Sequence, residues 1–535
     1  MPTARRIAIY DTTLRDGSQG HGISLTADDK LKVARALDDL GVAYIEGGWP
    51  GSNPKDIAFF EKAREIHWEH ARIVAFGSTT RAGVDAAQDT NLQLLLAAGT
   101  PAVTIVGKAS RIHVERVLGT TLAENLRMVR DSIVFLKAAG REVFFDAEHF
   151  FDGFAEDSDY ALAVIRAAAE AGADGVVLCD TNGGSLPDRI AEAVRAVRRE
   201  VACEIGIHTH DDCALAVANT LVAIENGATQ VQGTINGLGE RVGNANLCSI
   251  IPILEAKLGL SCLPDGHLQQ LTAVSRYVTE VANVAHNPRL PFVGAHAFTH
   301  KAGLHVNALA KEPTAYEHMA PEMVGNTRQV LVSELSGRSN VLIKARTFGI
   351  ELEPYPDVTR RILQTIKERE NAGFWYEDAD ASLELLIRQA MPDYRPPFEV
   401  IDYLVLGEYR DGHPMLAEAM VKLRVGDQVL HTAAEGDGPV NALDIAARKA
   451  LQAFYPEVAN IRLEDYKVRV LDDHQGTAAN VRVLIRSADQ QQSWSTVGAS
   501  PNVIEASWLA LADSLTYPLV VGRAERPAGD LVATL

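Results

Sequence analysis

The stretch Ile7-Ala8-Ile9-Tyr10-Asp11-Thr12-Thr13-Leu14-Arg15-Asp16-Gly17 places a short apolar segment directly before a polar loop. Ile7–Tyr10 is typical of a buried strand, and the glycine-punctuated residues after it indicate a loop at the strand's carboxyl end. Arg15 offers a planar set of donors suited to a carboxylate or a developing oxyanion, and Asp16 is a hard oxygen ligand or a base. The alternative is an Arg/Asp pair that only closes a turn, and the stretch alone does not decide between the two.

The strand-then-helix pattern repeats over roughly the first 260 residues. Thr26 and Asp29 form a capping-box pattern, apolar residues then recur at helical spacing, and Gly41 ends the first helix. Eight strands are predicted in all: Ile7–Tyr10, Val42–Ile45, Arg72–Phe76, Ala102–Val106, Glu142–Asp146, Gly175–Cys179, Glu204–His208 and Thr229–Gly233. Eight β/α units of this length predict an α/β fold, the closed (β/α)8 or TIM barrel, rather than an open doubly wound sheet.

Functional residues of such a barrel are expected on the loops that follow its strands. Polar residues do follow every predicted strand: Arg15, Asp16, Glu46, Ser78, Thr79, Lys108, Glu148, His149, Asp180, Thr181, His208, His210, Asn236 and Glu240. Because parallel strands of a barrel all end on the same face, we expect these side chains to converge on one mouth.

The segment His208-Thr209-His210 is the most specific group among them. Alternate residues of a strand point to the same face, so both imidazoles would point toward the barrel axis. With Asp16 and an amide oxygen such as that of Asn244, they predict a mixed nitrogen and oxygen site suited to Mn²⁺, Mg²⁺, Zn²⁺ or Co²⁺. Two hydrogen-bonding histidines at a strand end are the alternative, and the convergence with Asp16 favours the metal site.

A glycine-rich loop, Glu148 and Thr181 could each have either a functional role or a purely structural one. The loop from Gly233 to Asn244 is rich in glycine but lacks both the GxGxxG and the P-loop spacing, so no dinucleotide site is predicted. Its glycines are expected to allow close backbone approach at the mouth. Glu148 and Thr181 could each meet a bound carboxylate or a reacting carbonyl, and the alternatives are a solvated carboxylate and a helix N-cap.

The pattern changes after the barrel, which predicts three parts: residues 1–275, 276–394 and 395–535. The middle part reads as a helical linker; it contains His305 and Tyr316, which would serve a site only if this segment folds over one. Pro396 and Pro397 mark the next boundary. The last part is predicted as a small α+β domain with the strands Val400–Leu406, Ala417–Val425, Val468–Leu471 and Asn480–Ser487 and the helices Ala442–Phe454 and Val503–Thr516.

Composition excludes several classes of partner. The formal charge of −19 argues against binding to nucleic acid or an anionic membrane, which needs a basic face. No run of about 18 apolar residues is found, so neither a membrane span nor a secretion signal is expected. The five cysteines form no CxxC pair and no disulfide framework, which indicates reduced thiols and a cytoplasmic protein.

Three motifs together resemble the DRE-TIM metallolyase superfamily: Asp11–Gly17, His208–His210 and Asn236–Asn244. They are more narrowly similar to its acetyl-CoA-dependent synthases, the isopropylmalate, homocitrate and citramalate synthases, which condense acetyl-CoA with an α-keto acid. Near the C-terminus, Gly436–Val440 and Thr496–Trp508 resemble the regulatory domain of isopropylmalate-synthase-like enzymes. The resemblance therefore covers essentially the whole chain.

Four further segments look most like bacterial citramalate synthases: Tyr44–Lys55, Glu148–Gly153, Cys179–Gly184 and Ser336–Asn340. This resemblance implies pyruvate as the keto acid, acetyl-CoA as the co-substrate, and citramalate for isoleucine biosynthesis as the product. It also implies a homodimer in which the linker reaches over the neighbouring subunit's barrel, and isoleucine as a feedback inhibitor at the C-terminal domain. Asp211, where an asparagine is common, is a small departure that leaves both histidines in place.

The resemblance also implies a role for each candidate residue. The metal would be held by Asp16, His208 and His210, with Asn244 as a fourth or near ligand. Arg15 would stabilise the alkoxide on the keto oxygen, Thr181 would bind the pyruvate carboxylate, and His113 would belong to the substrate pocket. His305 would remove the proton from acetyl-CoA, with Tyr316 and Glu148 assisting.

Three alternatives stay open from the sequence. An isopropylmalate or homocitrate synthase would take a larger keto acid, since one or two apolar residues can set the accepted size. A lyase that cleaves a hydroxyacyl-CoA normally lacks the C-terminal domain. A non-catalytic amino-acid sensor would lack a ligand or the base, whereas this chain has Arg15, Asp16, His208, His210 and His305.

Overall fold

The computed structural model describes residues 6–524, apart from residues 410, 413, 414, 472–475 and 477. The outer limits of the predicted first and last parts, Met1 and Leu535, lie outside the described residues. The chain forms two compact units, residues 1–298 with 319–328 and residues 299–318 with 329–535, and each is described by itself. The division into three parts with limits at residues 275 and 394 stays a prediction.

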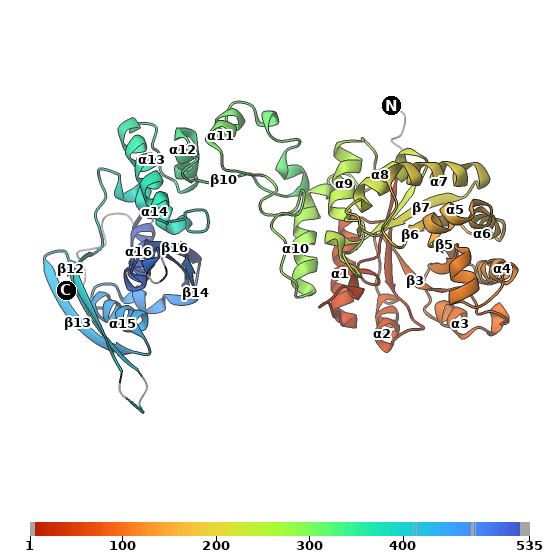
Figure 1. Cartoon of the computed structure of the whole chain (residues 1–535), viewed down its shortest axis with the longest axis horizontal. Helices are drawn as coiled ribbons and strands as arrows, with labels where there is room; N and C mark the ends of the chain where they lie inside the picture. The colour runs from red at the N-terminus through yellow and green to blue at the C-terminus, as the bar shows by residue number, and fades with distance from the viewer. Residues whose placement is uncertain (1–5, 410, 413–414, 472–475, 477, 525–535) are drawn as a thin grey trace. The chain divides into compact units, whose positions relative to one another are not determined.

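The first unit is built on a closed barrel of eight parallel strands in sequence order (Figure 1). The strands are β1 (Ala8–Asp11), β2 (Tyr44–Gly48), β3 (Arg72–Ser78), β4 (Ala102–Lys108), β5 (Glu142–Glu148), β6 (Gly175–Asp180), β7 (Glu204–Thr209) and β8 (Gln230–Gly233). Strand β1 pairs with both β2 and β8, which closes the sheet. The predicted TIM barrel is confirmed, and each predicted strand corresponds to an observed one.

Helices follow the strands and surround the barrel (Figure 1). They are α1 (Ala27–Leu40), α2 (Pro54–Ala63), α3 (Thr90–Ala97), α4 (Leu122–Ala138), α5 (Phe150–Glu156), α6 (Ser158–Glu170), α7 (Pro187–Glu200), α8 (Ala216–Glu225), α9 (Leu247–Ala256) and α10 (Leu271–Val281). Helix α1 begins with the expected capping box between Thr26 and Asp29 and ends at Gly41, which has the left-handed φ of 94° that favours glycine. The local signals of the sequence therefore place this helix as predicted.

The barrel interior contains both apolar and polar side chains. Tyr10, Val74, Ala102 and Phe144 form a small apolar cluster inside it. Beside this cluster lie buried polar side chains of four strands: Glu46, Thr104, Asp146 and Gln232. Because buried polar groups must be hydrogen-bonded, the partners of these four side chains constrain the residues at the mouth.

The second unit begins with helices and ends with two similar sheet-and-helix layers. Its helices before the sheets are α11 (Gly303–Leu309), α12 (Arg338–Thr347), α13 (Pro356–Asn371) and α14 (Asp380–Gln389), with a short parallel pair of strands, β9 (Thr299–His300) and β10 (Gln329–Val330). One antiparallel sheet consists of β11 (Glu399–Glu408), β12 (Leu416–Val425) and β13 (Gln428–Gly436), followed by α15 (Pro439–Leu451). The other consists of β14 (Arg462–Val470), β15 (Val481–Ala488) and β16 (Ser493–Ser500), followed by α16 (Val503–Ala524).

The predicted α+β domain is confirmed, but the prediction missed two of its strands, β13 and β16. Strand β13 is a polar edge strand whose residues are half-buried or exposed, and β16 is rich in serine, threonine and glycine. Neither has the alternating β-branched pattern that identifies a strand in sequence. Strand β14 also begins earlier than predicted, at Arg462 rather than Val468.

Within the part of the chain that the structure describes, no helix has both the length and the apolar composition needed to cross a membrane.

Candidate active site

The loop after β1 is fixed by hydrogen bonds within itself and to the end of β8. The Thr12 carbonyl accepts from the backbone nitrogens of Asp16 and Gly17 at 2.9 and 3.0 Å. The Thr13 backbone nitrogen and hydroxyl both donate to the Asp11 carboxylate, at 2.8 and 2.9 Å. The same hydroxyl accepts from the Ile235 backbone nitrogen at 2.9 Å, which ties the loop across the seam between β1 and β8.

Arg15 is held against the cavity wall by a fully buried carboxylate. Its Nε donates to Glu46 Oε1 at 2.5 Å, and its guanidinium carbon lies 3.8 Å from the centre of the Phe76 ring. The other oxygen of Glu46 accepts from the Tyr10 hydroxyl at 2.7 Å. Burial opposes the charge, but Glu46 and Asp16 outweigh it and raise the pKa of Arg15. Arg15 is therefore a fixed cation in position to stabilise negative charge in the cavity.

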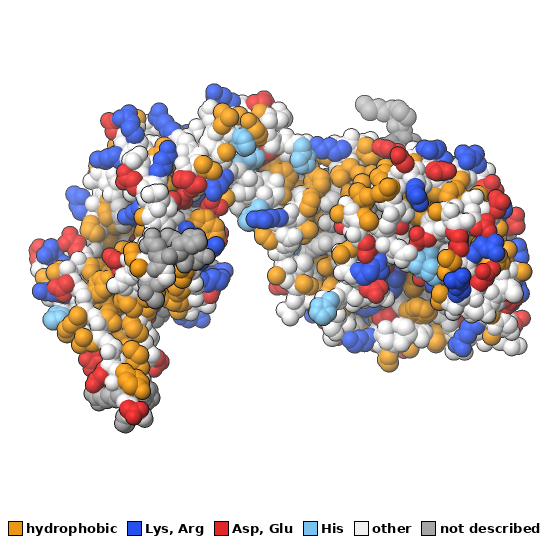
Figure 2. Space-filling model, viewed as in Figure 1, with side chains coloured by type: hydrophobic (Ala, Val, Ile, Leu, Met, Phe, Trp, Pro, Cys, Tyr) orange, Lys and Arg blue, Asp and Glu red, His pale blue; other side chains and the backbone are white. Residues whose placement is uncertain are grey.

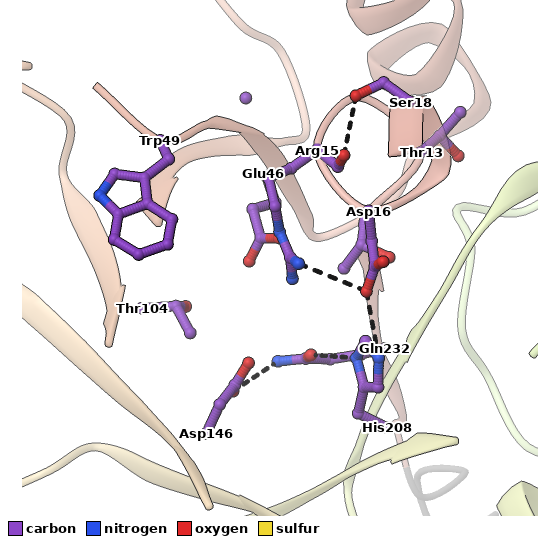
Figure 3. A network of polar contacts seen from close by, with 12 residues as sticks. Thr13, Arg15, Asp16, Ser18, Glu46, Trp49, Thr104, Asp146, His208 and Gln232 are labelled. Carbon is purple, nitrogen blue, oxygen red and sulfur yellow. Dashed lines mark hydrogen bonds and ion pairs between the residues drawn. The ribbon is translucent and has the colours of Figure 1, made fainter. Parts of the chain in front are cut away.

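Asp16, His208 and His210 lie together, as the sequence predicted. Each offers one ligand atom, and these atoms all lie within 4.8 Å of one another. His208 Nε2 is 3.3 Å from Asp16 Oδ2 (Figure 3). The same nitrogen is 3.4 Å from His210 Nε2. All three side chains are buried. Two imidazole lone pairs at this distance repel each other unless a proton or a metal ion lies between them.

The protonation states of the cluster suit a cation. Burial and the neighbouring His208 lower the pKa of His210 to about 4, so this ring is neutral at pH 7. For Asp16, burial favours the neutral acid, but Arg15 and His208 outweigh it and lower the pKa, which leaves a carboxylate. Burial also disfavours a charged His208, yet Asp16 raises its pKa, so a bound metal would displace a proton here.

Asn244 adds an oxygen donor beside these three residues. It forms an isolated backbone bridge with His210, and its side-chain nitrogen donates to the Leu238 carbonyl at 3.3 Å. Its Oδ1 is buried and has no hydrogen-bond partner among the described residues. A buried acceptor without a partner indicates a missing ligand or ion. The donor set of two imidazoles, a carboxylate and an amide oxygen therefore fits a divalent cation.

Glycines shape the loop that carries Asn244, in agreement with the sequence prediction. Gly243 has a φ of 106°, and a Cβ atom on it would lie 1.9 Å from the Gly237 carbonyl oxygen. Only glycine fits such a close approach of two backbone segments. The glycines therefore allow the backbone approach that positions Asn244.

A cavity of about 230 Å³ lies at the mouth, lined by residues from the barrel loops and strand ends. The lining residues are Arg15, Asp16, Gln19, Trp49, Phe76, Val106, Asp146, Glu148, Cys179, Thr181, His208, His210, Glu240 and Arg241. Thr181 Oγ1 accepts from the His149 backbone nitrogen at 2.9 Å, which leaves its hydrogen available for a bound carboxylate. Glu148 forms an ion pair with Lys108. The predicted residues Arg15, Asp16, Glu148, Thr181, His208 and His210 thus share one cavity.

Apart from Asn244, which lies beside the cluster, three of the predicted residues do not line this cavity. His113 stacks on His149 with 3.6 Å between ring centres, and burial together with that neighbour lowers its pKa. His305 and Tyr316 belong to the second unit, where their rings stack with centres 4.2 Å apart. Both of these side chains are exposed. The roles of all three stay predictions.

The sequence prediction missed the polar residues that support the cluster from inside the barrel. His208 Nδ1 contacts Gln232 Oε1 at 2.8 Å, and Gln232 Nε2 donates to Asp146 Oδ1 at 3.1 Å. Burial and the charge of Glu46 raise the pKa of Asp146 to about 7. The signal for Gln232 was present in the sequence, because Gln230-Val231-Gln232 alternates amides with an apolar residue in a buried strand.

The fold and the cluster together define a barrel protein with a candidate site for a divalent metal. The profile of the HMGL-like family matches residues 6–278. A profile described as homocitrate synthase post-HMGL domain-like matches residues 292–373, and one described as the LeuA allosteric (dimerisation) domain matches residues 377–519. The chain belongs to the HMGL-like family.

Similar proteins extend this result over nearly the whole chain. An (R)-citramalate synthase from Geobacter sulfurreducens is 51% identical over 514 residues, which covers 96% of this chain and 97% of that protein. One from Aquifex aeolicus is 49% identical over 97% of this chain and 98% of its own length. A 2-isopropylmalate synthase from Methanocaldococcus jannaschii is 30% identical over 95% of this chain and 94% of its own length. The predicted resemblance to these acetyl-CoA-dependent synthases is confirmed.

Replacing His210 by alanine tests the metal site directly. We expect Mn²⁺ affinity to fall by more than the roughly 10–100-fold that loss of an outer partner of a metal ligand costs. Equilibrium dialysis of the substrate-free protein measures this affinity. His431→Ala, which removes an exposed imidazole on β13, is the control and should bind as the wild type does. Unchanged binding by His210→Ala would rule out the site as described.

Proposed function

We propose that this chain is an (R)-citramalate synthase, an acyltransferase that condenses acetyl-CoA with pyruvate and hydrolyses the thioester to (R)-citramalate and CoA. The proposal rests on a difference in sequence identity between two groups of relatives that match nearly the whole chain. Five (R)-citramalate synthases are 44–51% identical to the chain, whereas two 2-isopropylmalate synthases reach 30–32%. The product would enter isoleucine biosynthesis by a route that does not start from threonine.

The cavity residues can bind and polarise a small keto acid. A divalent ion held by Asp16, His208 and His210, with Asn244 beside them, supplies Lewis-acid polarisation of the keto carbonyl when bound. The Thr181 hydroxyl is free to donate to the pyruvate carboxylate. Arg15 uses its Nε for Glu46 and has Nη1 3.4 Å from Asp16, which leaves Nη2 for the oxygen that becomes an alkoxide.

The condensation needs a base near the methyl group of acetyl-CoA. We assign this role to His305, with Tyr316 assisting. The methyl carbon loses a proton to the base and forms a bond to the keto carbon, whose π electrons pass to the oxygen beside Arg15. That oxygen is then protonated, and water cleaves the thioester to release CoA. Glu148, on the cavity wall in an ion pair with Lys108, assists by positioning the reactants.

We also propose a homodimer, in which each barrel receives His305 from the neighbouring chain. The match to a dimerisation domain over residues 377–519 supports this arrangement. Exposed hydrophobic side chains also gather over the sheet β11–β13, where Leu404, Leu406 and Met420 are 46%, 53% and 37% exposed (Figure 2). Apolar surface of this kind marks a protein interface.

Two further assignments follow from the proposed pathway. The C-terminal domain would bind isoleucine, the end product, as a feedback inhibitor, in keeping with the allosteric domain that its sequence matches. The cytoplasm would be the compartment, because all five cysteines are free thiols, as reducing conditions favour.

An isopropylmalate synthase is the second candidate, since one or two apolar residues can set the accepted keto acid. A panel of keto acids distinguishes the two. With acetyl-CoA and Mn²⁺, release of free CoA is expected to be fastest with pyruvate and to slow with 2-oxobutyrate and 2-oxoisovalerate. Isoleucine is expected to inhibit the pyruvate reaction more than leucine does. A preference for 2-oxoisovalerate would instead establish the isopropylmalate reaction.

Replacing Arg15 by alanine tests the charge that faces the alkoxide. Turnover is expected to fall on the order of 10²–10³-fold or more, because a fixed donor to the developing oxyanion is lost. Mn²⁺ binding and the circular dichroism spectrum should persist. Arg72→Ala removes an ion pair to Glu142 whose arginine is 58% exposed, and it serves as the control with normal turnover. Full activity of Arg15→Ala would contradict the assigned role.

Mixing two inactive variants tests the shared site. In a dimer of Arg15→Ala and His305→Ala chains, one barrel keeps Arg15 and receives His305 from its partner, so one of the two sites is intact. Co-refolded equal amounts should recover about a quarter of wild-type activity, because random pairing makes half of the dimers mixed. No recovery, with mixed dimers demonstrated by differently tagged chains, would place His305 in its own subunit's site.

A further inference from the structure

Strand β8 carries two buried glutamines with different surroundings. Gln230 and Gln232 are 1% and 0% exposed, and alternate strand positions place both side chains on the same face of the strand. The amide of Gln230 has no hydrogen-bond partner among the described residues. Gln232 uses both ends of its amide, toward His208 and toward Asp146. Only one of the two glutamines is therefore linked to the metal cluster.

The contacts of Gln232 form a short relay. Asp146 Oδ1, on β5, accepts from Gln232 Nε2 at 3.1 Å, and Gln232 Oε1 lies 2.8 Å from His208 Nδ1. Figure 3 shows Asp146, Gln232 and His208 in a row, with Asp16 on the far side of the imidazole. All of these residues are at most 5% exposed, so water does not compete for the bonds.

The chemistry of the relay gives it a direction. Gln232 Nε2 donates to Asp146 Oδ1, so the NH2 group of Gln232 faces Asp146. The carbonyl oxygen of the amide then faces His208 and can only accept, so the imidazole must carry its hydrogen on Nδ1. A metal that displaces the remaining proton of the imidazole then meets the lone pair of Nε2, the nitrogen next to Asp16 and His210.

We propose that Asp146 and Gln232 are positioning residues that lock His208 in the tautomer and ring orientation required of a metal ligand. The proposal rests on the metal-dependent function proposed above. Outer partners of this kind commonly orient metal-binding histidines, usually through a single carboxylate or carbonyl. Here the Asp146 carboxylate acts indirectly, through the Gln232 amide, whose orientation is fixed by its two hydrogen bonds.

The test measures Mn²⁺ affinity of the substrate-free, full-length protein by equilibrium dialysis. Gln232→Leu leaves Nδ1 without an acceptor and is expected to weaken binding about 10–100-fold. Gln230→Leu is the matched control, because it removes an equally buried glutamine from the same strand without touching the relay, and its affinity should equal that of the wild type. Equal affinity of Gln232→Leu and wild type, or an equal loss in Gln230→Leu, would overturn the proposal.

A swapped variant keeps the test decisive if Gln232→Leu does not fold. Combining Asp146→Asn with Gln232→Glu exchanges the amide and the carboxylate, so an acceptor again faces His208 and a donor again joins the two partners. Gln232→Glu alone sets two carboxylates against each other and should bind Mn²⁺ more weakly than the swapped protein. Swapped protein that binds no better than Gln232→Glu alone would overturn the proposal.

Nitrogen-15 NMR of histidine-labelled, Zn²⁺-loaded protein gives a second readout that packing alone would not change. One imidazole Nδ1–H, slow to exchange with solvent, is expected in wild type and in the swapped variant, and it should be lost in Gln232→Leu. If the wild type turns over substrate and binds Mn²⁺ but shows no such hydrogen, the proposed relay is wrong and the proposed function is not affected. A wild type that binds no Mn²⁺ would overturn the metal site and the relay with it.

Discussion

A carboxylate that water cannot reach determines the arrangement of this barrel mouth. Glu46 is fully buried, and a buried charge costs several kcal/mol unless cations and donors compensate for it. Tyr10 donates to one of its oxygens from inside the barrel, and Arg15 donates to the other from the loop. Glu46 therefore fixes the position of Arg15, which lines the cavity. Asp16, the next residue, is brought to the histidines by the same constraint.

The interior of the barrel serves the site as much as the loops do. Many TIM barrels fill the interior with branched apolar side chains. Here Asp146 and Gln232 replace part of that packing with directed hydrogen bonds that reach His208. A buried donor or acceptor that loses its partner destabilises the fold. The packing of the barrel strands and the arrangement of the residues at the mouth are therefore coupled. A change of register in β5 or β8 would displace the cluster even if every ligand were present.

The sequence predicts those features of the fold and the site that depend on local patterns of residues. The eight strands, the capping box of α1 and the convergence of Asp16, His208 and His210 on one mouth depend on periodicity and on the rule that parallel strands end together. Gln232 and Asp146 escaped prediction because their partnership depends on register across the barrel. Strands β13 and β16 escaped it because they are short of β-branched residues. His113 turned out to stack on His149, a contact made by two loops whose relative position no local pattern gives.

The proposed metal site also spans the point where the barrel closes. Asp16 follows β1, whereas His208 lies on β7, and β8 lies between these two strands in the sheet. The ligands are therefore far apart in the unfolded chain and meet only once the first and last strands have paired. An ion that binds the closed barrel and not the open chain stabilises closure by mass action. A cation at the proposed site would therefore also link the first and last strands of the sheet, so that metal binding and barrel closure would be thermodynamically coupled.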